Sequence, residues 1–84
     1  MRKNDQLLPD EVLRENIKNN LIALRKKHGL TQVDIAIMTD KAAPTVASWE
    51  QGKSLPDLQT LYRLSIFYKK SMEYFYEHDI KDGD

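Results

Sequence analysis

Apolar residues recur through the first third of the chain at the spacing of an α-helix. The residues concerned are Leu13, Ile17, Leu21 and Leu24. They are separated by four, four and three positions, which places them along one face of a helix. We expect this helix to begin at Pro9 or Asp10, because proline and acidic residues are favoured in a first turn, and to end at Lys27 or His28. Gly29 then suits the left-handed conformation that often follows a helix.

Residues 30–52 have the pattern of two short helices joined by a tight turn. The first helix is predicted over residues 31–38, with the Thr31 side chain as its cap. The second is predicted over residues 43–51, where Val46 and Trp49 provide an apolar face and Gly52 ends the helix. Asp40 lies between them and is one of the few residue types that tolerate a left-handed turn conformation. The pattern predicts a helix-turn-helix.

The second of these helices is expected to start without a side-chain cap. Ala42 has no side-chain oxygen, which costs about 0.5–2 kcal/mol relative to serine or threonine. A residue that precedes proline is also disfavoured in helical geometry. We therefore expect the helix to begin at Pro44 rather than at Ala43.

Two more helices are predicted after Leu55 and Pro56 interrupt the chain. Asp57 should start the first of them, and Ser71 can cap the second, which begins at Met72. The apolar face of the first is expected to comprise Leu58, Leu61, Leu64 and Tyr68, with Ile66 and Phe67 alongside. With no strand pattern, the sequence predicts an all-α, compact five-helix domain over residues 9–80, a flexible N-terminal arm over residues 1–8 and a disordered acidic tail over residues 81–84.

The charges are unevenly distributed although the net charge of the 84 residues is zero. Residues 14–70 carry ten basic and five acidic side chains, whereas residues 71–84 carry one lysine and five acidic side chains. The basic helical region favours a polyanionic partner. The acidic tail is expected either to be merely solvated or to weaken nonspecific DNA binding by repelling phosphates.

Enzymatic, metal-binding and membrane functions lack the residues they need. The chain has no cysteine, and His28 and His78 stand without a nucleophile or metal-ligand spacing. No glycine-rich phosphate loop and no apolar run of about 20 residues is present. We therefore expect a protein that is not an enzyme, has no cofactor and no metal, and does not enter a membrane. With no export signal seen, we expect it in the cytoplasm.

Four pieces of sequence resemble a known family. They are LRKKHGLTQ at residues 24–32, Ile35 with Ala36, TVASWEQGKSLPDLQTL at residues 45–61 and KKSMEYF at residues 69–75. In combination they resemble the Xre/Cro-type helix-turn-helix family of bacterial and phage repressors, over about residues 14–76. The resemblance implies a lambda-repressor-like five-helix fold in which the predicted second and third helices form the helix-turn-helix. It also implies binding to double-stranded operator DNA, usually as a homodimer, in a bacterial or phage context.

The resemblance assigns individual residues to DNA contact. The candidate DNA-binding residues are Thr31, Gln32, Lys41, Ala43, Pro44, Thr45, Ser48, Gln51 and Lys53. Gln32 would meet the DNA backbone or an outer base, and a helix N-terminus is independently a good phosphate site. Thr45 and Ser48 would face the major groove, and Lys53 would lie against phosphates. Arg25 and Glu50 are assigned to a structural ion pair that ties the first helix to the end of the third.

The groove-facing positions lack Arg, Asn and Gln, whose bidentate base contacts are worth about 1–3 kcal/mol each. Ala43 and Pro44 can contact thymine methyl groups, Thr45 and Ser48 can hydrogen-bond a base edge or water, and DNA shape would supply the remaining preference. We therefore expect few direct hydrogen bonds between these side chains and the bases.

Two functions remain open from the sequence. The first is a DNA-binding transcriptional regulator, most simply a repressor. The second is a protein-interaction module that keeps the same scaffold and binds DNA weakly or not at all, which the zero net charge and the bland third helix favour. Both allow a regulatory protein partner and self-association through Tyr74, Phe75 and Tyr76, unless Phe75 belongs to the core and the two tyrosines cover it.

Overall fold

The computed structural model describes residues 7–79 and contains five helices in that range, with no strand. The helices are α1 (Asp10–Lys27), α2 (Gln32–Thr39), α3 (Ala43–Glu50), α4 (Leu58–Tyr68) and α5 (Met72–Glu77). The prediction of an all-helical domain is confirmed. The expected acidic tail lies outside the described residues, as do positions 1–6 of the expected N-terminal arm.

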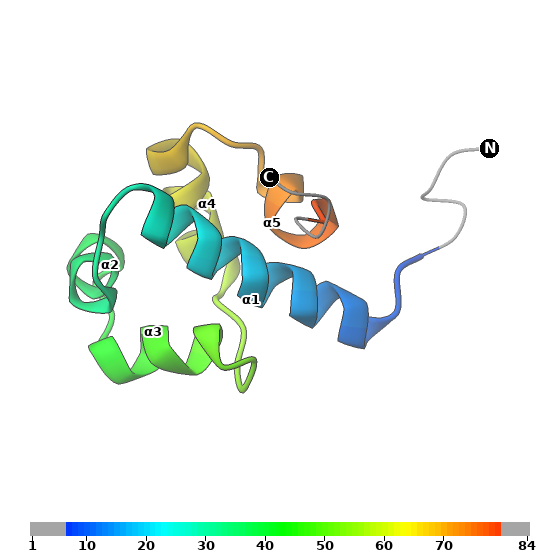
Figure 1. The fold of residues 1–84 in the computed structure, drawn as a ribbon, viewed down its shortest axis with the longest axis horizontal. Helices are drawn as coiled ribbons and strands as arrows, with labels where there is room; N and C mark the ends of the chain where they lie inside the picture. Colours follow the sequence, from blue (N-terminus) through cyan, green and yellow to red (C-terminus); the bar gives the residue numbers. More distant parts are fainter. Residues whose placement is uncertain (1–6, 80–84) are drawn as a thin grey trace.

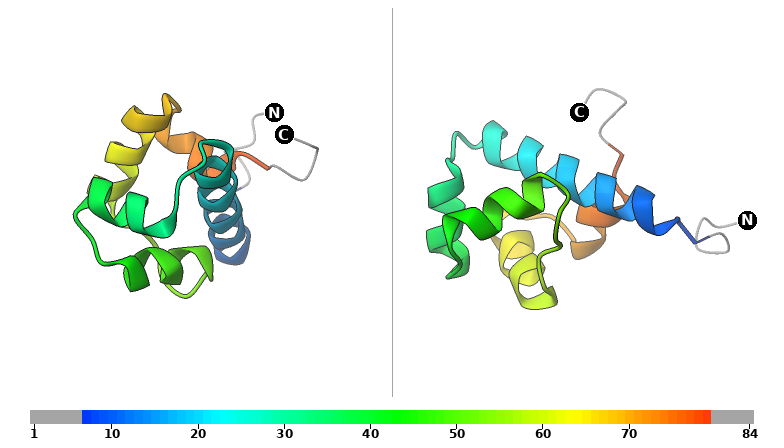
Figure 2. Two further views of the ribbon diagram at one scale, coloured as in Figure 1. Left: turned by 60° about the vertical axis from the view of Figure 1, so that its left-hand side comes forward. Right: turned by 90° about the horizontal axis from the view of Figure 1, so that it is seen from below.

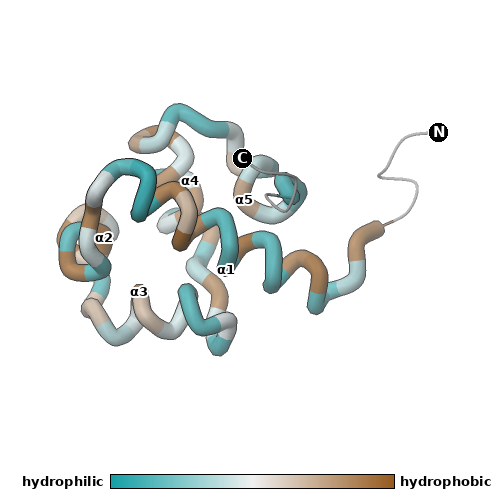
Figure 3. The backbone as a smooth tube through the Cα atoms, viewed as in Figure 1, coloured by the Kyte–Doolittle hydropathy of each residue, from teal (hydrophilic) through white to brown (hydrophobic). Residues whose placement is uncertain are grey.

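The long α1 helix lies between α5 and α3 (Figure 1). It packs against α5 on one side and α3 on the other, while α2 packs against both α3 and α4. Two further views show α2 and α3 next to each other at one end of the molecule (Figure 2). Apolar and polar stretches alternate along the helices, as expected when each helix buries one face (Figure 3). The helix-turn-helix is therefore an outer layer on a scaffold of α1, α4 and α5.

One hydrophobic core joins all five helices. Its members are Ile17, Leu21, Leu24, Ile35, Ala36, Val46, Trp49, Leu61, Leu64, Tyr68 and Phe75. The predicted apolar stripe of α1 is buried from Ile17 onward, whereas Leu13 is half-buried. Val46 and Trp49 anchor α3 in this core, which leaves the opposite side of α3 accessible.

The predicted helix caps are present. The Thr31 hydroxyl accepts a hydrogen bond from the Asp34 backbone N–H, and the Asp34 carboxylate accepts one from the Thr31 N–H, which forms a capping box at the start of α2. Asp57 caps α4 by accepting from the Thr60 N–H, and Ser71 caps α5 in the same way. Each cap satisfies a backbone donor that has no partner inside its helix.

The start of α3 differs from the prediction by one residue. The Ala42 carbonyl accepts a hydrogen bond from the Val46 N–H, so Ala43 is the first helical residue and Pro44 the second. Proline is tolerated there because the N–H that it lacks would have no acceptor inside the first turn. The expectation that Ala42 provides no side-chain cap is confirmed.

The apolar face of α4 also differs from the prediction. Its buried residues are Thr60, Leu61, Leu64, Ser65 and Tyr68. Leu58 is 74% exposed, and Ile66 and Phe67 are also exposed. The small side chains of Thr60 and Ser65 take part in the buried face, so its centre is turned away from Leu58. The helix therefore keeps apolar residues on its outer surface.

A buried asparagine that the sequence analysis did not single out ties α1 to α5. Asn20 is 1% exposed, and its Nδ2 donates to the backbone carbonyls of Tyr74, Phe75 and His78 at 3.2, 2.9 and 2.9 Å. Carbonyls in the last turn of a helix lack partners within the helix, and this side chain provides a donor for the Phe75 carbonyl there. Its effect is to hold the short α5 helix, and with it Phe75, against α1.

Candidate nucleic-acid interface

The turn between α2 and α3 has the predicted left-handed residue. Asp40 has φ 59° and ψ 43°, and the following Lys41 N–H donates to the Ala36 carbonyl at 2.9 Å, which closes the end of α2. Ala36 is buried, and its small side chain permits the close packing of α2 on α3. This turn sets the direction of α3 relative to α2.

Four residues of α3 are predicted to face a DNA groove, and none of them is buried: Ala43, Pro44, Thr45 and Ser48. Ala43 is half-buried and packs against the core. Gln51, predicted to lie against phosphates through its backbone, is exposed just after α3. Ser48 has a partner that sequence reasoning missed, because its hydroxyl lies 2.8 Å from the Ser54 hydroxyl in the following loop. The pair holds the loop against α3 and directs one hydroxyl hydrogen into a local bond.

A hydrogen-bond network connects α1, α2 and α3 beside this surface. Arg25 donates to the Glu50 carboxylate through Nε at 2.7 Å and through Nη2 at 3.0 Å, so the predicted pair is present and bidentate. Gln32 joins it, because its Nε2 donates to Glu50 Oε1 at 3.0 Å. Arg25 Nη1 also donates to the Leu30 carbonyl at 2.9 Å, just before α2. The start of α2 is thus held by Arg25 of α1 through Leu30 and by Glu50 of α3 through Gln32.

The pKa values near this network follow its geometry. The hydrogen bond to Glu50 raises the pKa of Arg25, and this exceeds the opposing effect of burial. Burial raises the pKa of Tyr68, in the core next to the pair, to about 12. At physiological pH the Arg25 side chain is therefore charged and the Tyr68 side chain is neutral.

Two predicted phosphate contacts have different surroundings. Lys41 Nζ lies 3.3 Å from the Asp57 carboxylate, so its charge is partly offset within the chain. Hydrogen bonds from Thr60, supplemented by Lys41, lower the pKa of Asp57 to about 2. Lys53 is exposed and has no acidic side chain in salt-bridge contact within residues 7–79. Of the two lysines, Lys53 is the better placed to neutralise a phosphate.

The fold brings the Lys18 side chain to the end of α3, while its Nζ lies 3.7 Å from the Glu15 carboxylate. The aliphatic part of the Lys18 side chain passes close to Gly52, where an added Cβ would lie 3.5 Å from Lys18 Cδ. Gly52 has φ 76°, a conformation that favours glycine. No sequence signal pointed to Lys18, because its position depends on how α1 crosses α3.

The aromatic residues of α5 differ in their exposure. Phe75 is completely buried, so it has no surface for a second subunit. Tyr74 and Tyr76 are half-buried against the core, and the Tyr74 ring stacks on His78 with Lys70 Nζ 4.6 Å from its centre. The sequence alternative in which Phe75 is core and tyrosines cover it matches this arrangement.

Residues 7–79 lack the features of a metal site and of a membrane-spanning helix. In this range no group of three or more His, Cys, Asp or Glu side chains has the geometry to hold a metal ion. Over the same residues no helix is long and apolar enough to cross a membrane. The accessible surface of α3 with the N-terminus of α2 remains the best-defined candidate site.

Two helices packed about a left-handed turn, with a capped first helix and an accessible second one, define a helix-turn-helix protein. A family model described as Helix-turn-helix matches residues 21–75, which is more than half of the chain. The chain belongs to this family, of the Xre/Cro type, and is a DNA-binding helix-turn-helix regulator. Searches of curated proteins and of solved structures returned no match.

Proposed function

We propose that this protein is a transcriptional repressor that binds double-stranded operator DNA as a homodimer, with α3 in the major groove. The proposal includes a cytoplasmic location in a bacterium or a phage-infected cell, and it includes no cofactor. One observation carries it: the outward face of α3 is accessible while Gln32, at the start of α2, is held beside it by Glu50. The same constellation supports Arg25 and Glu50 as positioning residues rather than DNA contacts.

The N-terminus of α2 is suited to a phosphate. The backbone N–H groups of Gln32 and Val33 lie in the first turn, where no acceptor exists within the helix, and the helix dipole favours an anion there. Because Gln32 Nε2 donates to Glu50, the amide is fixed in orientation before DNA binds. Lys53 would add positive charge at the same end of α3, which Gln32 reaches through Glu50, and so would Lys18, whose Nζ also lies 3.7 Å from Glu15.

Base recognition would be mainly apolar at the start of α3. Ala43 and Pro44 lack hydrogen-bonding side chains, and thymine is the base that presents a methyl group in the major groove. Thr45 supplies a hydroxyl one position later. We therefore propose that operator half-sites carry thymines opposite the first turn of α3.

A protein-interaction role without tight DNA binding is the second candidate. The observation that favours it is the Lys41–Asp57 ion pair, which offsets one of the few cations near α3. The zero net charge of the chain also favours this second candidate. The two candidates differ most in how their affinity for duplex DNA responds to salt, since each phosphate contact steepens that dependence.

The deciding experiment measures binding of the purified protein to the DNA upstream of its own gene and to a scrambled duplex, across a salt series. Selective binding that weakens steeply with salt, and that is lost in Gln32→Ala and Ser48→Ala, would establish the repressor-type interface. Gln59→Ala is the matched control, because Gln59 is an exposed glutamine on α4, outside the helix-turn-helix. Failure to bind either duplex at low salt would reject the DNA mechanism in favour of the second candidate.

A further inference from the structure

The exposed apolar side chains of this protein are concentrated on α4. Of the ten large hydrophobic residues that are exposed in the described part of the chain, four belong to this one helix. They are Leu58, Tyr62, Ile66 and Phe67, with exposed fractions of 74, 56, 61 and 46%. Single exposed hydrophobic residues are ordinary, but a contiguous group on one element marks an interaction surface.

Three of these residues form a stripe along the helix. Leu58, Tyr62 and Ile66 are spaced four positions apart, so they lie one above the other on the same side of α4. We call these three residues the α4 stripe. A stripe with this spacing is the pattern that a helix uses to pack against another helix.

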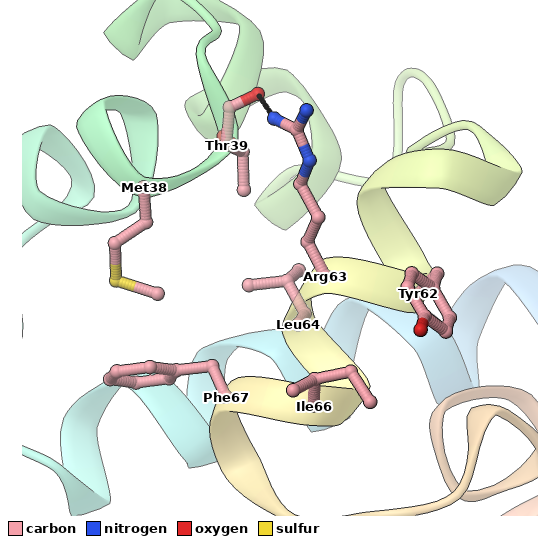
Figure 4. A pocket seen from close by; sticks show the side chains of 7 residues that line it. All are labelled: Met38, Thr39, Tyr62, Arg63, Leu64, Ile66 and Phe67. Carbon is pink, nitrogen blue, oxygen red and sulfur yellow. Dashed lines mark hydrogen bonds between the residues drawn. The ribbon is translucent and has the colours of Figure 1, made fainter.

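A hollow of about 410 Å³ lies beside the stripe, between α4 and the end of α2. It is lined by Met38, Thr39, Tyr62, Arg63, Leu64, Ile66 and Phe67 (Figure 4). The Arg63 guanidinium turns toward α2, where Nη1 donates to the Thr39 carbonyl at 3.4 Å (Figure 4). Because the charged group is turned that way, it leaves the apolar side chains of Ile66 and Phe67 uncovered.

We infer that the α4 stripe is the surface on which a second copy of this chain docks, with the two α4 helices antiparallel about a two-fold axis near Tyr62. In that arrangement Tyr62 meets its symmetry mate, and Leu58 of each copy meets Ile66 of the other. The most exposed residue of the stripe, Leu58, then enters the partner copy's hollow beside Ile66 and Phe67. The surface is thus self-complementary, as a two-fold interface requires.

The available area fits a second copy. The four exposed residues of α4 present on the order of 500 Å² in one subunit, at roughly 150–250 Å² for a fully exposed large side chain. A symmetric contact would bury on the order of 1,000 Å² in total, which is the lower limit of specific interfaces and typical of weak ones. The interface is therefore expected to form a concentration-dependent dimer.

This inference builds on the proposed function, because it names the surface through which the repressor would dimerise. It differs from the predicted contact through α5, where Phe75 is completely buried and Tyr74 and Tyr76 are half-buried. Helix α4 packs against α2, so a contact through α4 joins the two copies beside the helix-turn-helix. A two-fold axis there would carry two copies of α3 toward two operator half-sites.

The absence of cysteine from the chain gives a direct test. Tyr62→Cys places a single thiol at the expected two-fold axis, where facing helix positions come within disulfide distance. Val12→Cys is the control, because Val12 is an exposed apolar residue on α1. Under mild oxidation without DNA, we expect Tyr62→Cys to form a covalent dimer at least tenfold faster than Val12→Cys. Equal rates would overturn the inference.

Sedimentation of the cysteine-free protein provides the second measurement. We expect a reversible dimer that Ile66→Lys weakens at least tenfold and that Val12→Lys leaves unchanged, with circular dichroism checking that each variant is folded. A wild-type protein that stays monomeric at about 1 mM, where even millimolar affinities are detected, would also overturn the inference. Neither measurement contains DNA, so a negative result here leaves the proposed DNA binding standing, and a failure of DNA binding leaves this result standing.

Discussion

Replacing Glu50 by glutamine removes the charge at the centre of the network that joins α1, α2 and α3. The Glu50 carboxylate accepts two hydrogen bonds from Arg25 and one from Gln32, and the Glu50 side chain is only 7% exposed. In Glu50→Gln one of these acceptors becomes an NH₂ donor that faces another donor. The Arg25 guanidinium, 15% exposed, then keeps its charge without a counter-charge.

The expected cost is about 3 kcal/mol of unfolding free energy, at the lower end of the range for removing one partner of a buried ion pair. For a domain of this size, each kcal/mol lowers the melting temperature by about 4–8 °C. Glu50→Gln should therefore melt roughly 12–24 °C below the wild type. Its DNA affinity should also fall at a temperature where it is still folded, because Gln32 loses its fixed orientation.

Urea and thermal unfolding followed by circular dichroism would measure this effect. Glu15→Gln is the matched control, since Glu15 is an exposed glutamate on α1 and should change stability by less than about 0.5 kcal/mol. In a double-mutant cycle with Arg25→Met, the double variant should lose much less than the sum of the single losses. The assignment of Arg25 and Glu50 as a structural ion pair would be refuted by either of two results. One is an unfolding free energy of Glu50→Gln within about 1 kcal/mol of the wild type, and the other is a double variant whose loss equals the sum of the single losses.

Three further predictions concern a cap, a turn and the operator. The folded-state pKa of Asp57 is about 2, below its unfolded value, so its contribution to stability is present above pH 4–5 and is lost as the pH falls toward 2. The melting temperatures of wild type and Asp57→Asn should therefore converge as the pH falls over that range. A difference in melting temperature that does not change with pH would contradict this. Lys69 has φ 58°, so Lys69→Gly should raise the unfolding free energy by up to about 1 kcal/mol in urea titrations, whereas Lys70→Gly should not. If Ala43 and Pro44 contact thymine methyl groups, replacing those operator thymines by uracil should weaken binding about two- to fivefold per methyl group, while uracil outside the half-sites should have no effect.

Much of the local structure could be predicted from the sequence. The caps at Thr31, Asp57 and Ser71 and the left-handed turn at Asp40 are all in place. Each depends on a side chain and on backbone groups within about four residues of it. Such features carry their own signal, because the atoms involved are neighbours in the chain. The Arg25–Glu50 pair was expected only through the family resemblance, since its partners are far apart in sequence.

The main wrong prediction concerns which face of α4 is buried. The spacing of Leu58, Leu61 and Leu64 fits one helical face, yet Leu58 is exposed while Thr60 is buried. Helical periodicity alone allows either orientation, because a face can be turned by one position without changing its spacing. The choice depends on the surfaces that α2 and α5 present to α4, and these exist only in the folded domain.

The sequence by itself therefore determined the five helices, the caps that start three of them, and the kind of protein that they build. The tertiary structure decided which side chains meet across helices. It placed Gln32 on Glu50, Lys41 on Asp57 and Lys18 beside Gly52, and it left the α4 stripe facing outward. The physical reason is distance along the chain. Caps and turns form between neighbouring residues, whereas these contacts join residues on different helices and depend on how those helices pack.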